Sequence, residues 1–219
     1  MIYSKRIKKI ASIVDSGVNV VDIGCDHGLL DIYLTLNNNN KCIAADINQN
    51  SLNSAISNIK KMNLNIETIL SNGFENIEVK KNSTCIIAGM GTNTIISILN
   101  NSKRELVDTF IIQTNNDYYN LRKQMINYGY YIDEEIVFED KKIWYVIIKF
   151  KKGKVKYKKN ELELGPVLIN KNDEETNKYF ETLFNKYNKL LELIPRKHII
   201  KRIKLKILIR YIKNVGPAS

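Results

Sequence analysis

The sequence has few residues of the kinds that bind transition metals or form disulfides. It contains two histidines and three cysteines among 219 residues, and no two cysteines form a C-x-x-C pair. No zinc-ligand spacing is present, so we expect no metal cofactor. Cys42 and Cys85 lie inside apolar runs that predict strands, and Cys25 is the third cysteine. An odd number of buried thiols fits a reducing compartment, so we expect a cytoplasmic protein.

Long apolar runs are missing as well. No stretch approaches the roughly 18 uncharged apolar residues that a membrane span requires, so we expect no membrane partner. Residues 1–15 have four basic residues but no continuous apolar run, which argues against a secretory signal. Hydrophobic residues make up 44% and charged residues 26% of the chain, which excludes a disordered or fibrous protein. We expect a globular protein that is a monomer.

The net charge of +11 is distributed unevenly along the chain. Residues 1–150 contain 16 basic and 16 acidic residues, whereas residues 151–219 contain 18 basic and 7 acidic residues. The last third of the chain therefore carries the whole excess of positive charge. This asymmetry favours a neutral body with a basic part that binds nucleic acid, rather than a merely solvated basic face.

Apolar periodicity over the first 150 residues predicts an α/β fold. After a helix over residues 4–15, strands and helices alternate five times, as in βαβ units that build a parallel sheet. Strands are expected over residues 18–23, 41–47, 66–70, 84–88 and 109–113, and helices over residues 28–36, 51–62 (capped by Asn50), 94–99 and 118–128. Residues 131–138 and 143–150, joined by a loop of four polar residues, predict an antiparallel hairpin that closes the sheet.

The basic part predicts two helices. Residues 151–159 are a linker candidate, and Gly165-Pro166 interrupts the segment that follows. From Tyr179 apolar residues recur with heptad-like steps until Pro195, and a second helix starts near Arg196. The apolar stripe of this second helix consists of Ile200, Ile203, Ile207 and Tyr211. The short break predicts an antiparallel hairpin in which the first helix covers this stripe. A helix that lies on a membrane surface is the rival interpretation.

The sharpest motif is Val21-Asp22-Ile23-Gly24-Cys25-Asp26-His27-Gly28, which follows the first predicted strand and opens a helix. Gly24 permits a tight turn, and Gly28 permits close packing of the helix on the strand. In dinucleotide-binding loops, a glycine at the position of Asp26 makes room for a pyrophosphate. A carboxylate there repels phosphate and suits an ammonium group, which favours S-adenosylmethionine over a nicotinamide cofactor. A plain glycine turn is the alternative.

Four later strands also end in polar or glycine-rich loops. Asp46 ends the second strand, where a carboxylate can accept hydrogen bonds from both ribose hydroxyls of an adenosine. Asn72-Gly73 follows the third strand and can contact an adenine edge, although a generic turn fits equally well. Gly89-Met90 follows the fourth strand and lets a flat group approach the backbone. Gln113 and Asn115 end the fifth strand with amides that both donate and accept, as recognition of a base edge requires.

Together these motifs resemble the bacterial tRNA methyltransferases that modify N1 of adenosine 22. The matching motifs are Ser4-Lys5-Arg6, Asp22-Ile23-Gly24, Asp26-His27-Gly28, Ala88-Gly89-Met90-Gly91, Gln113 with Asn115, and Gly165-Pro166, which span nearly the whole chain. The family pattern has Gly, Pro and Pro where this chain has Thr92, Asp31 and Thr114. The resemblance implies a class I (Rossmann-like) methyltransferase domain over residues 1–155. It also implies a basic helical coiled-coil domain over residues 156–219 that helps to hold tRNA.

This interpretation assigns three groups of candidate residues. The catalytic candidates are Asp26, Met90 and Asn115. The candidates for binding S-adenosylmethionine are Gly24, Cys25, Asp26, His27, Gly28, Asp46, Ile47, Asn72, Gly73, Gly89 and Met90. The candidates for binding RNA phosphates are Arg6, Lys197, Lys201, Arg202, Lys204, Lys206 and Arg210. For Asp26, binding the amino group of the cofactor is the milder alternative to a catalytic role.

Two other functions stay open on the residues alone. One is a non-catalytic RNA-binding protein that has kept a methyltransferase-like fold, and the other is a methyltransferase that acts on ribosomal RNA or protein. The combination of Gly24, Asp26 and Asp46 favours an enzyme. Adenine N1 has a neutral lone pair, so the task of such an enzyme is to hold N1, the methyl carbon and sulfur in line.

Overall fold

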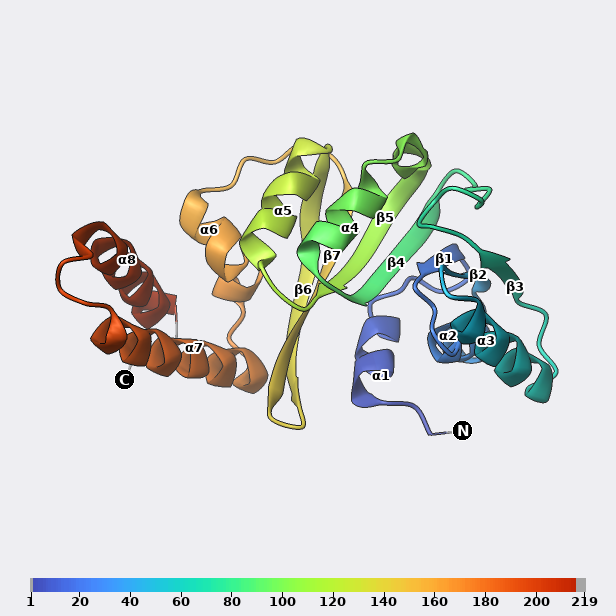
Figure 1. Cartoon of the computed structure of the whole chain (residues 1–219), viewed down its shortest axis with the longest axis horizontal. Helices are drawn as coiled ribbons and strands as arrows, with labels where there is room; N and C mark the ends of the chain where they lie inside the picture. The colour runs from blue at the N-terminus through green and yellow to red at the C-terminus, as the bar shows by residue number, and fades with distance from the viewer. Residues whose placement is uncertain (1, 216–219) are drawn as a thin grey trace. The chain divides into compact units, whose positions relative to one another are not determined.

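The computed structural model describes residues 2–215 of the chain (Figure 1). Residue 1 and residues 216–219, at the outer ends of the two predicted domains, lie outside the described residues. The chain divides into two compact units. The first contains the residues up to Glu134 together with Ile147–Val155, and the second contains Glu135–Val146 together with the residues from Lys156 onward. The tip of a β-hairpin therefore belongs to the second unit.

A mixed sheet with the strand order β3-β2-β1-β4-β5-β7-β6 organises the first unit (Figure 1). Strands β1 to β5 pair in parallel, and β7 pairs antiparallel with β5. The strands are β1 Asn19–Ile23, β2 Lys41–Asp46, β3 Glu67–Leu70, β4 Ser83–Met90, β5 Val107–Thr114, β6 Tyr130–Asp140 and β7 Ile143–Lys152. This arrangement confirms the predicted parallel sheet closed by a hairpin, and the strand order reverses between β1 and β4.

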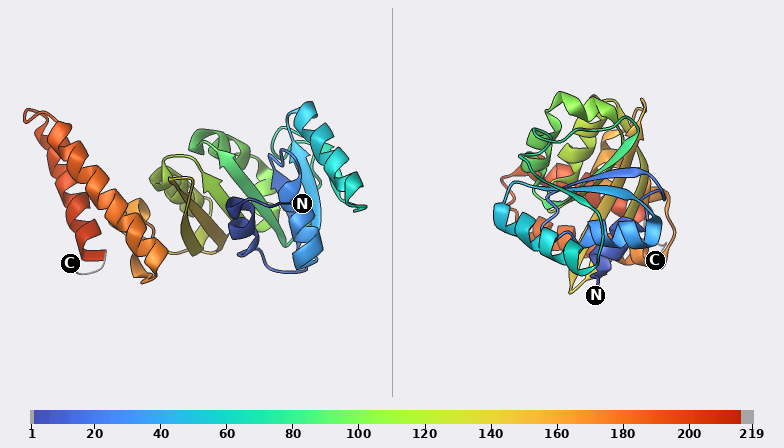
Figure 2. Two further views of the ribbon diagram at one scale, coloured as in Figure 1. Left: turned by 90° about the horizontal axis from the view of Figure 1, so that it is seen from below. Right: turned by 90° about the vertical axis from the view of Figure 1, so that its right-hand side faces the viewer.

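Helices cover both faces of this sheet, which explains why β1 and β5 are buried along almost their whole length. Helices α1, α2 and α3 pack together on one face, and α4 and α5 pack together on the other (Figures 1 and 2). The helices of this unit are α1 Lys5–Ala11, α2 Leu29–Asn38, α3 Gln49–Lys61, α4 Thr92–Leu99 and α5 Tyr118–Asn127, with a 3-10 turn η1 over Ser102–Leu106.

Three local predictions for the sheet and the helices that cover it were wrong. Helix α3 is capped by Asn48 and not Asn50, because the Asn48 side chain accepts a hydrogen bond from the Asn50 N–H. The hairpin turns on Lys141 and Lys142 alone, whose φ angles of 51° and 64° allow a two-residue turn that matches strand twist. One of the five predicted strand–helix repeats, the third, lacks its helix, because residues 71–82, all described, contain no helix between β3 and β4.

The second unit contains the predicted pair of long helices. Helix α7 spans Glu174–Leu193 and begins five residues before the predicted start, because Asp173 caps it by accepting a hydrogen bond from the Thr176 N–H at 2.8 Å. Helix α8 spans Ile199–Val215 and packs antiparallel to α7 (Figure 2). Helix α6 (Lys159–Leu164) and a 3-10 turn η2 (Leu168–Asn170) precede them. No helix among the described residues is long and apolar enough to cross a membrane.

The apolar stripe predicted for α8 is exposed and not covered by α7 as expected. Ile203 is 51% exposed and Ile207 is 52% exposed, whereas Ile212 is buried. The reason is Arg202, whose guanidinium Nη1 donates hydrogen bonds to the carbonyls of Leu191 and Ile194 at the end of α7. These bonds turn the face that contains Arg202 and Ile212 inward, and the isoleucines of the predicted stripe outward.

Glu135 connects the tip of the β6–β7 hairpin to the rest of the second unit. Its side chain is fully buried, and its carboxylate accepts hydrogen bonds from the N–H groups of Val167 at 3.0 Å and Leu168 at 3.3 Å. These two amides follow the Gly165-Pro166 motif, so the motif shapes the turn that meets the carboxylate. On the same tip, the Trp144 ring packs on Tyr179 of α7, with 5.5 Å between ring centroids.

We predict that Glu135→Ala destabilises the second unit by on the order of 2–3 kcal/mol, because two buried N–H groups lose a charged acceptor. Urea unfolding followed by circular dichroism measures this loss. Glu134→Ala is the matched control, since it removes the same charge from the neighbouring half-buried residue. Equal stabilities of the two variants would contradict this role for Glu135.

Candidate active site

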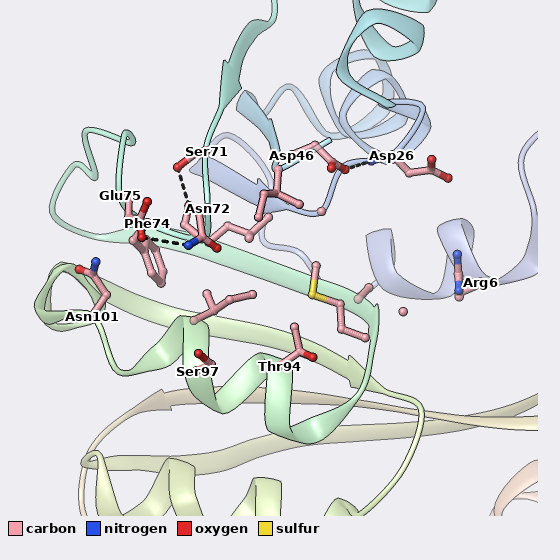
Figure 3. A pocket seen from close by; sticks show the side chains of 18 residues that line it. Arg6, Asp26, Asp46, Ser71, Asn72, Phe74, Glu75, Thr94, Ser97 and Asn101 are labelled. Carbon is pink, nitrogen blue, oxygen red and sulfur yellow. Dashed lines mark hydrogen bonds between the residues drawn. The ribbon is translucent and has the colours of Figure 1, made fainter. Parts of the chain in front are cut away.

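A cavity of about 520 Å³ opens at the carboxyl ends of β1, β2, β3 and β4 (Figure 3). Parallel sheets bind ligands at this edge, beside the point where the strand order reverses, and this volume suits a small-molecule ligand. Eight of the eleven predicted cofactor residues line the cavity: Gly24, Asp26, Asp46, Ile47, Asn72, Gly73, Gly89 and Met90. The chain therefore brings together residues that are as many as 66 positions apart in sequence.

The Asp46 carboxylate is held in a fixed orientation at the end of β2. One oxygen accepts a hydrogen bond from the Asp26 N–H at 3.0 Å, and the other accepts one from the Asn48 N–H at 2.8 Å. Each carboxylate oxygen retains a second lone pair for a hydroxyl donor. Asp46 thus fixes the loop after β1 and can also accept hydrogen bonds from a ligand.

The loop after β1 approaches its neighbours very closely. A Cβ atom on Gly24 (φ +86°) would lie 2.2 Å from the Met90 side chain, and one on Gly28 (φ +67°) would lie 3.0 Å from the Ala55 Cβ of α3. The predicted contact of Gly28 with the strand is thus a contact with α3. Cys25 and Gly28 are buried outside the cavity lining. The His27 ring is 57% exposed and lies 3.6 Å from the Asp26 carboxylate.

Two amide side chains fix the backbone at the end of β4. Gln113 is buried, and its Oε1 accepts a hydrogen bond from the Gly89 N–H at 3.1 Å. Its Nε2 donates to Asn115 Oδ1 at 3.2 Å, and Asn115 Nδ2 donates to the Gly89 carbonyl at 2.8 Å. Asn115 therefore does not line the cavity but is bonded to Gly89, which does.

The loop after β3 contains residues that the sequence did not single out. Asn72 Nδ2 donates a hydrogen bond to Glu75 Oε1 at 2.9 Å, and both residues line the cavity (Figure 3). The Lys103 ammonium donates to three carbonyls of this loop, those of Phe74, Glu75 and Ile77, at 2.9–3.0 Å. No sequence signal marks Lys103, because it reaches the loop only through the tertiary fold.

The predicted RNA-binding residues lie in two separate places. Arg6, on α1, lines the cavity. Arg202 is half-buried and bonded to carbonyls of α7, as described above. The other five, Lys197, Lys201, Lys204, Lys206 and Arg210, are exposed. Among the residues from 2 to 215, no cluster of three His, Cys, Asp or Glu side chains could hold a metal ion.

A sequence model described as tRNA (adenine(22)-N(1))-methyltransferase (TrmK) matches residues 20–214. The match includes the strands of the sheet and both long helices, except Asn19 at the start of β1 and Val215 at the end of α8. The chain belongs to this family. A protein of Mycoplasma genitalium is 35% identical over 191 residues, which are 84% of this chain and 87% of that protein. The tRNA (adenine(22)-N(1))-methyltransferase of Bacillus subtilis is 32% identical over 151 residues, which are 66% of this chain and 63% of that protein.

Solved structures extend the similarity to the whole fold. The structure of M. capricolum TrmK bound to S-adenosyl-homocysteine aligns with a TM-score of 0.83 and 30% identity, over 98% of this chain and 97% of that chain. A Streptococcus pneumoniae structure in complex with S-adenosyl-L-methionine aligns with a TM-score of 0.85 and 27% identity, over 98% and 99% of the two chains.

Thr92 and Thr114, two of the positions at which the sequence analysis expects a departure from the family pattern, contact each other. Their hydroxyl groups hydrogen bond at 2.8 Å. The Thr92 hydroxyl also donates to the Asn116 carbonyl at 2.6 Å. This buried link joins the ends of β4 and β5 behind the cavity, so the Thr92 side chain leaves the Gly89–Met90 backbone accessible.

Asp31, the third position at which the sequence analysis expects a departure, forms a buried acidic pair with Asp22. Both carboxyl groups are buried, and among the described residues neither Asp31 oxygen has a hydrogen-bond partner of ordinary geometry. Burial, followed by the negative charge of Asp22, raises the pKa of Asp31 well above its usual range. Burial also raises the pKa of Asp22 to about 7, against the opposing effect of its interaction with the Asp31 carboxyl group; the charge of Asp46 raises this pKa further and that of Arg6 lowers it. At least one of the two carboxyl groups thus keeps its proton near neutral pH.

This pair predicts a loss of stability as the pH rises. An acid whose pKa is higher in the folded state than in the unfolded state binds its proton more tightly when the protein is folded. Its contribution to the free energy of unfolding is therefore complete below about pH 4 and declines toward pH 7. We expect Asp31→Asn to gain stability relative to the original chain between pH 5 and pH 8, measured by denaturant unfolding. Glu67→Gln, which changes an exposed acid on β3, is the control. If the difference in free energy of unfolding between Asp31→Asn and the original chain stays constant across this pH range, Asp22 and Asp31 do not hold a proton as described.

Proposed function

We propose that this chain transfers a methyl group from S-adenosylmethionine to N1 of adenosine 22 in tRNA. The observation that carries the proposal is the family match over residues 20–214, which includes the cavity lining from Ile23 to Asn101 and the basic helical hairpin together. The M. capricolum and S. pneumoniae relatives, bound to S-adenosyl-homocysteine and S-adenosyl-L-methionine, support the choice of cofactor.

The chemistry of the cavity fits this cofactor. Asp46 offers oriented carboxylate oxygens for the ribose hydroxyls, and the exposed Asp26 carboxylate suits the ammonium group of the amino-acid end. Ile47 supplies an apolar surface, and the Asn72–Glu75 pair supplies donors and acceptors for the adenine edge. Gly24, Gly73, Gly89 and Met90 would line the remaining contact surface.

S-adenosylmethionine supplies an electrophilic methyl group on a sulfonium ion. The residues of this chain then have three tasks: to hold the two reactants in line, to exclude water, and to stabilise positive charge on the methylated base. Gln113 and Asn115 fix the Gly89 backbone, where we place the amino group of the target base. Asp26 is the carboxylate that can balance the charge of the base, so we keep Asp26, Met90 and Asn115 as the catalytic candidates.

We assign tRNA binding to the basic segment. Residues 151–219 carry the whole net charge of the chain, and Lys197, Lys201, Lys204, Lys206 and Arg210 are exposed on or beside α8. Such residues bind phosphates without reading the base sequence. This division of labour corresponds to a methyltransferase domain over residues 1–155 and a tRNA-binding domain over residues 156–219. The non-catalytic alternative is disfavoured because Asp26 and Asp46 both remain at the cavity.

We predict that Asp46→Ala weakens binding of S-adenosylmethionine by about 1.5–3 kcal/mol, because the ribose loses a charged acceptor and the loop after β1 loses its anchor. Isothermal titration calorimetry measures the affinity. Glu67→Ala removes an exposed acid from the neighbouring strand and should bind like the original chain. Unchanged affinity of Asp46→Ala would refute the assigned cofactor site.

The exposed lysines of α8 predict that the affinity for tRNA falls as the salt concentration rises. Replacing the exposed Lys201, Lys204 and Lys206 with Ala should weaken binding and reduce the slope of log affinity against log salt by up to roughly 0.9 for each duplex phosphate that the variant no longer neutralises. Arg202 is left in place because it holds α8 against the end of α7. The control replaces the exposed Lys60, Lys61 and Lys80 of the first unit, which gives the same net charge. If both triple variants weaken tRNA binding equally, α8 has no special role in it.

A further inference from the structure

Lys103 uses all of its side-chain hydrogen-bond donors on one loop. A lysine ammonium has three N–H donors and no acceptor. In Lys103 it donates to the carbonyls of Phe74 at 3.0 Å, Glu75 at 2.9 Å and Ile77 at 2.9 Å, all in the loop after β3. Lys103 is half-buried and does not line the cavity. Its ammonium has no donor left for a ligand, so it acts on the site through the residues that it holds.

The loop after β3 needs such a contact because it has no helix in which its carbonyls could pair. Three carbonyl oxygens lie within 3.0 Å of the Lys103 ammonium, and their partial negative charges would repel one another without a cation between them. Hydrogen bonds from a charged donor are roughly twice as strong as neutral ones. Removal of the ammonium would therefore release the loop at three points at once.

Glu75 is held from two sides at the cavity. Its carbonyl accepts a hydrogen bond from Lys103, and its carboxylate Oε1 accepts one from Asn72 Nδ2 at 2.9 Å (Figure 3). Glu75 is exposed and lines the cavity, so its side chain would sample several rotamers without these bonds. With them the carboxylate is fixed beside the cavity, and it keeps lone pairs for a further donor.

Lys103 also holds a residue of another element that lines the cavity. Its backbone N–H donates to the Asn101 side chain at 2.9 Å, and Asn101 is the cap of η1. Figure 3 shows Asn101 at the same end of the cavity as Asn72 and Glu75, away from Arg6. Lys103 thus connects the loop after β3 to η1 at this end of the cavity.

We propose that Lys103 is a positioning residue through which the cavity selects the adenine base of S-adenosylmethionine. It holds the loop after β3 so that the Glu75 carboxylate accepts a hydrogen bond from the adenine N6 amino group. The proposal rests on the proposed function and deepens it, because it names the residue that gives the Asn72–Glu75 pair its selectivity. Hypoxanthine has an oxygen in place of this amino group. That oxygen would face the carboxylate without a donor between them, and unpaired polar groups of this kind disfavour the wrong ligand strongly.

The test compares S-adenosyl-homocysteine with S-inosyl-homocysteine, which carries hypoxanthine, by isothermal titration calorimetry on the full chain. The original chain should bind S-adenosyl-homocysteine about 10- to 100-fold more tightly. Lys103→Met keeps most of the side-chain length but has no donor. It should weaken binding of S-adenosyl-homocysteine about 10-fold and change binding of S-inosyl-homocysteine by no more than about twofold. Lys103→Arg should restore part of the selectivity.

Steady-state methylation of tRNA separates positioning from a loss of structure. The adenine contacts are the same before and during methyl transfer, so Lys103→Met should raise the KM for S-adenosylmethionine about 10-fold and leave kcat within about twofold. A variant that is merely less stable would lower kcat in proportion to its folded fraction and leave KM unchanged. That second result would overturn the proposal.

Lys152→Met is the matched control. The Lys152 ammonium also donates within the protein, to the Glu105 carbonyl at 2.7 Å and to the Asp108 carboxylate at 2.9 Å, and none of these three residues lines the cavity. This variant should keep the selectivity of the original chain. If Lys103→Met keeps it as well, Lys103 has no role in selecting the base.

If Lys103→Met does not fold, Lys103→Gln takes its place, because glutamine retains two donors. Its selectivity for S-adenosyl-homocysteine should fall in the same direction but less, and unchanged selectivity would overturn the proposal. Equal affinities of the original chain for the two ligands would also overturn it, while the proposed function would stand. If the original chain binds neither ligand, the proposed function itself fails, and the role of Lys103 with it.

Discussion

The Asp46 carboxylate is the interaction on which the site depends. It accepts one hydrogen bond from the loop after β1 and one from the Asn48 N–H beside the first turn of α3, so a single side chain joins three elements. Because both amides donate to the same carboxylate, the backbone of the loop at Asp26 is tied to the end of β2. The position of the Asp46 oxygens and the position of the Asp26 backbone are therefore set together.

The sheet and the centre of the site were predictable because both depend on local patterns. Parallel strands buried on two faces produce continuous apolar runs, and their carboxyl ends meet at one edge. Asp26, Asp46, Asn72 and Gly89 could be selected for this reason, since each closely follows a strand or ends one. Arg6 could not, because it precedes the first strand and reaches the cavity only through packing of α1. On a helix that also carries Lys5, Lys8 and Lys9, it resembles any phosphate-binding side chain.

The errors in the basic segment have a different physical origin. Helix α8 is rich in isoleucine and leucine around most of its circumference, so its periodicity supports more than one inward face. Arg202 selects one of these faces, because its guanidinium donates hydrogen bonds to carbonyls at the end of α7. The sequence did not indicate this, since a charged residue was expected to point outward. Likewise, the contact between the hairpin tip and the rest of the second unit depends on Glu135, a buried acid whose partners lie more than 30 residues away.

Thr92, Thr114 and Asp31 form contacts that no local sequence pattern indicates. The first two form a hydrogen-bonded pair between the start of α4 and the end of β5. Asp31 adds a second buried acid next to Asp22. Buried contacts of this kind support the cavity although none of the three side chains lines it.

The most direct test of the account is to map the methylated nucleotide. Two tRNA transcripts that differ only at nucleotide 22, one with adenosine and one with guanosine, are incubated with the protein and S-adenosylmethionine. The products are analysed by nuclease digestion and mass spectrometry. The account predicts one 1-methyladenosine at nucleotide 22 of the first transcript and no methylation of the second. Methylation at another position, equal methylation of both transcripts, or none at all would contradict it.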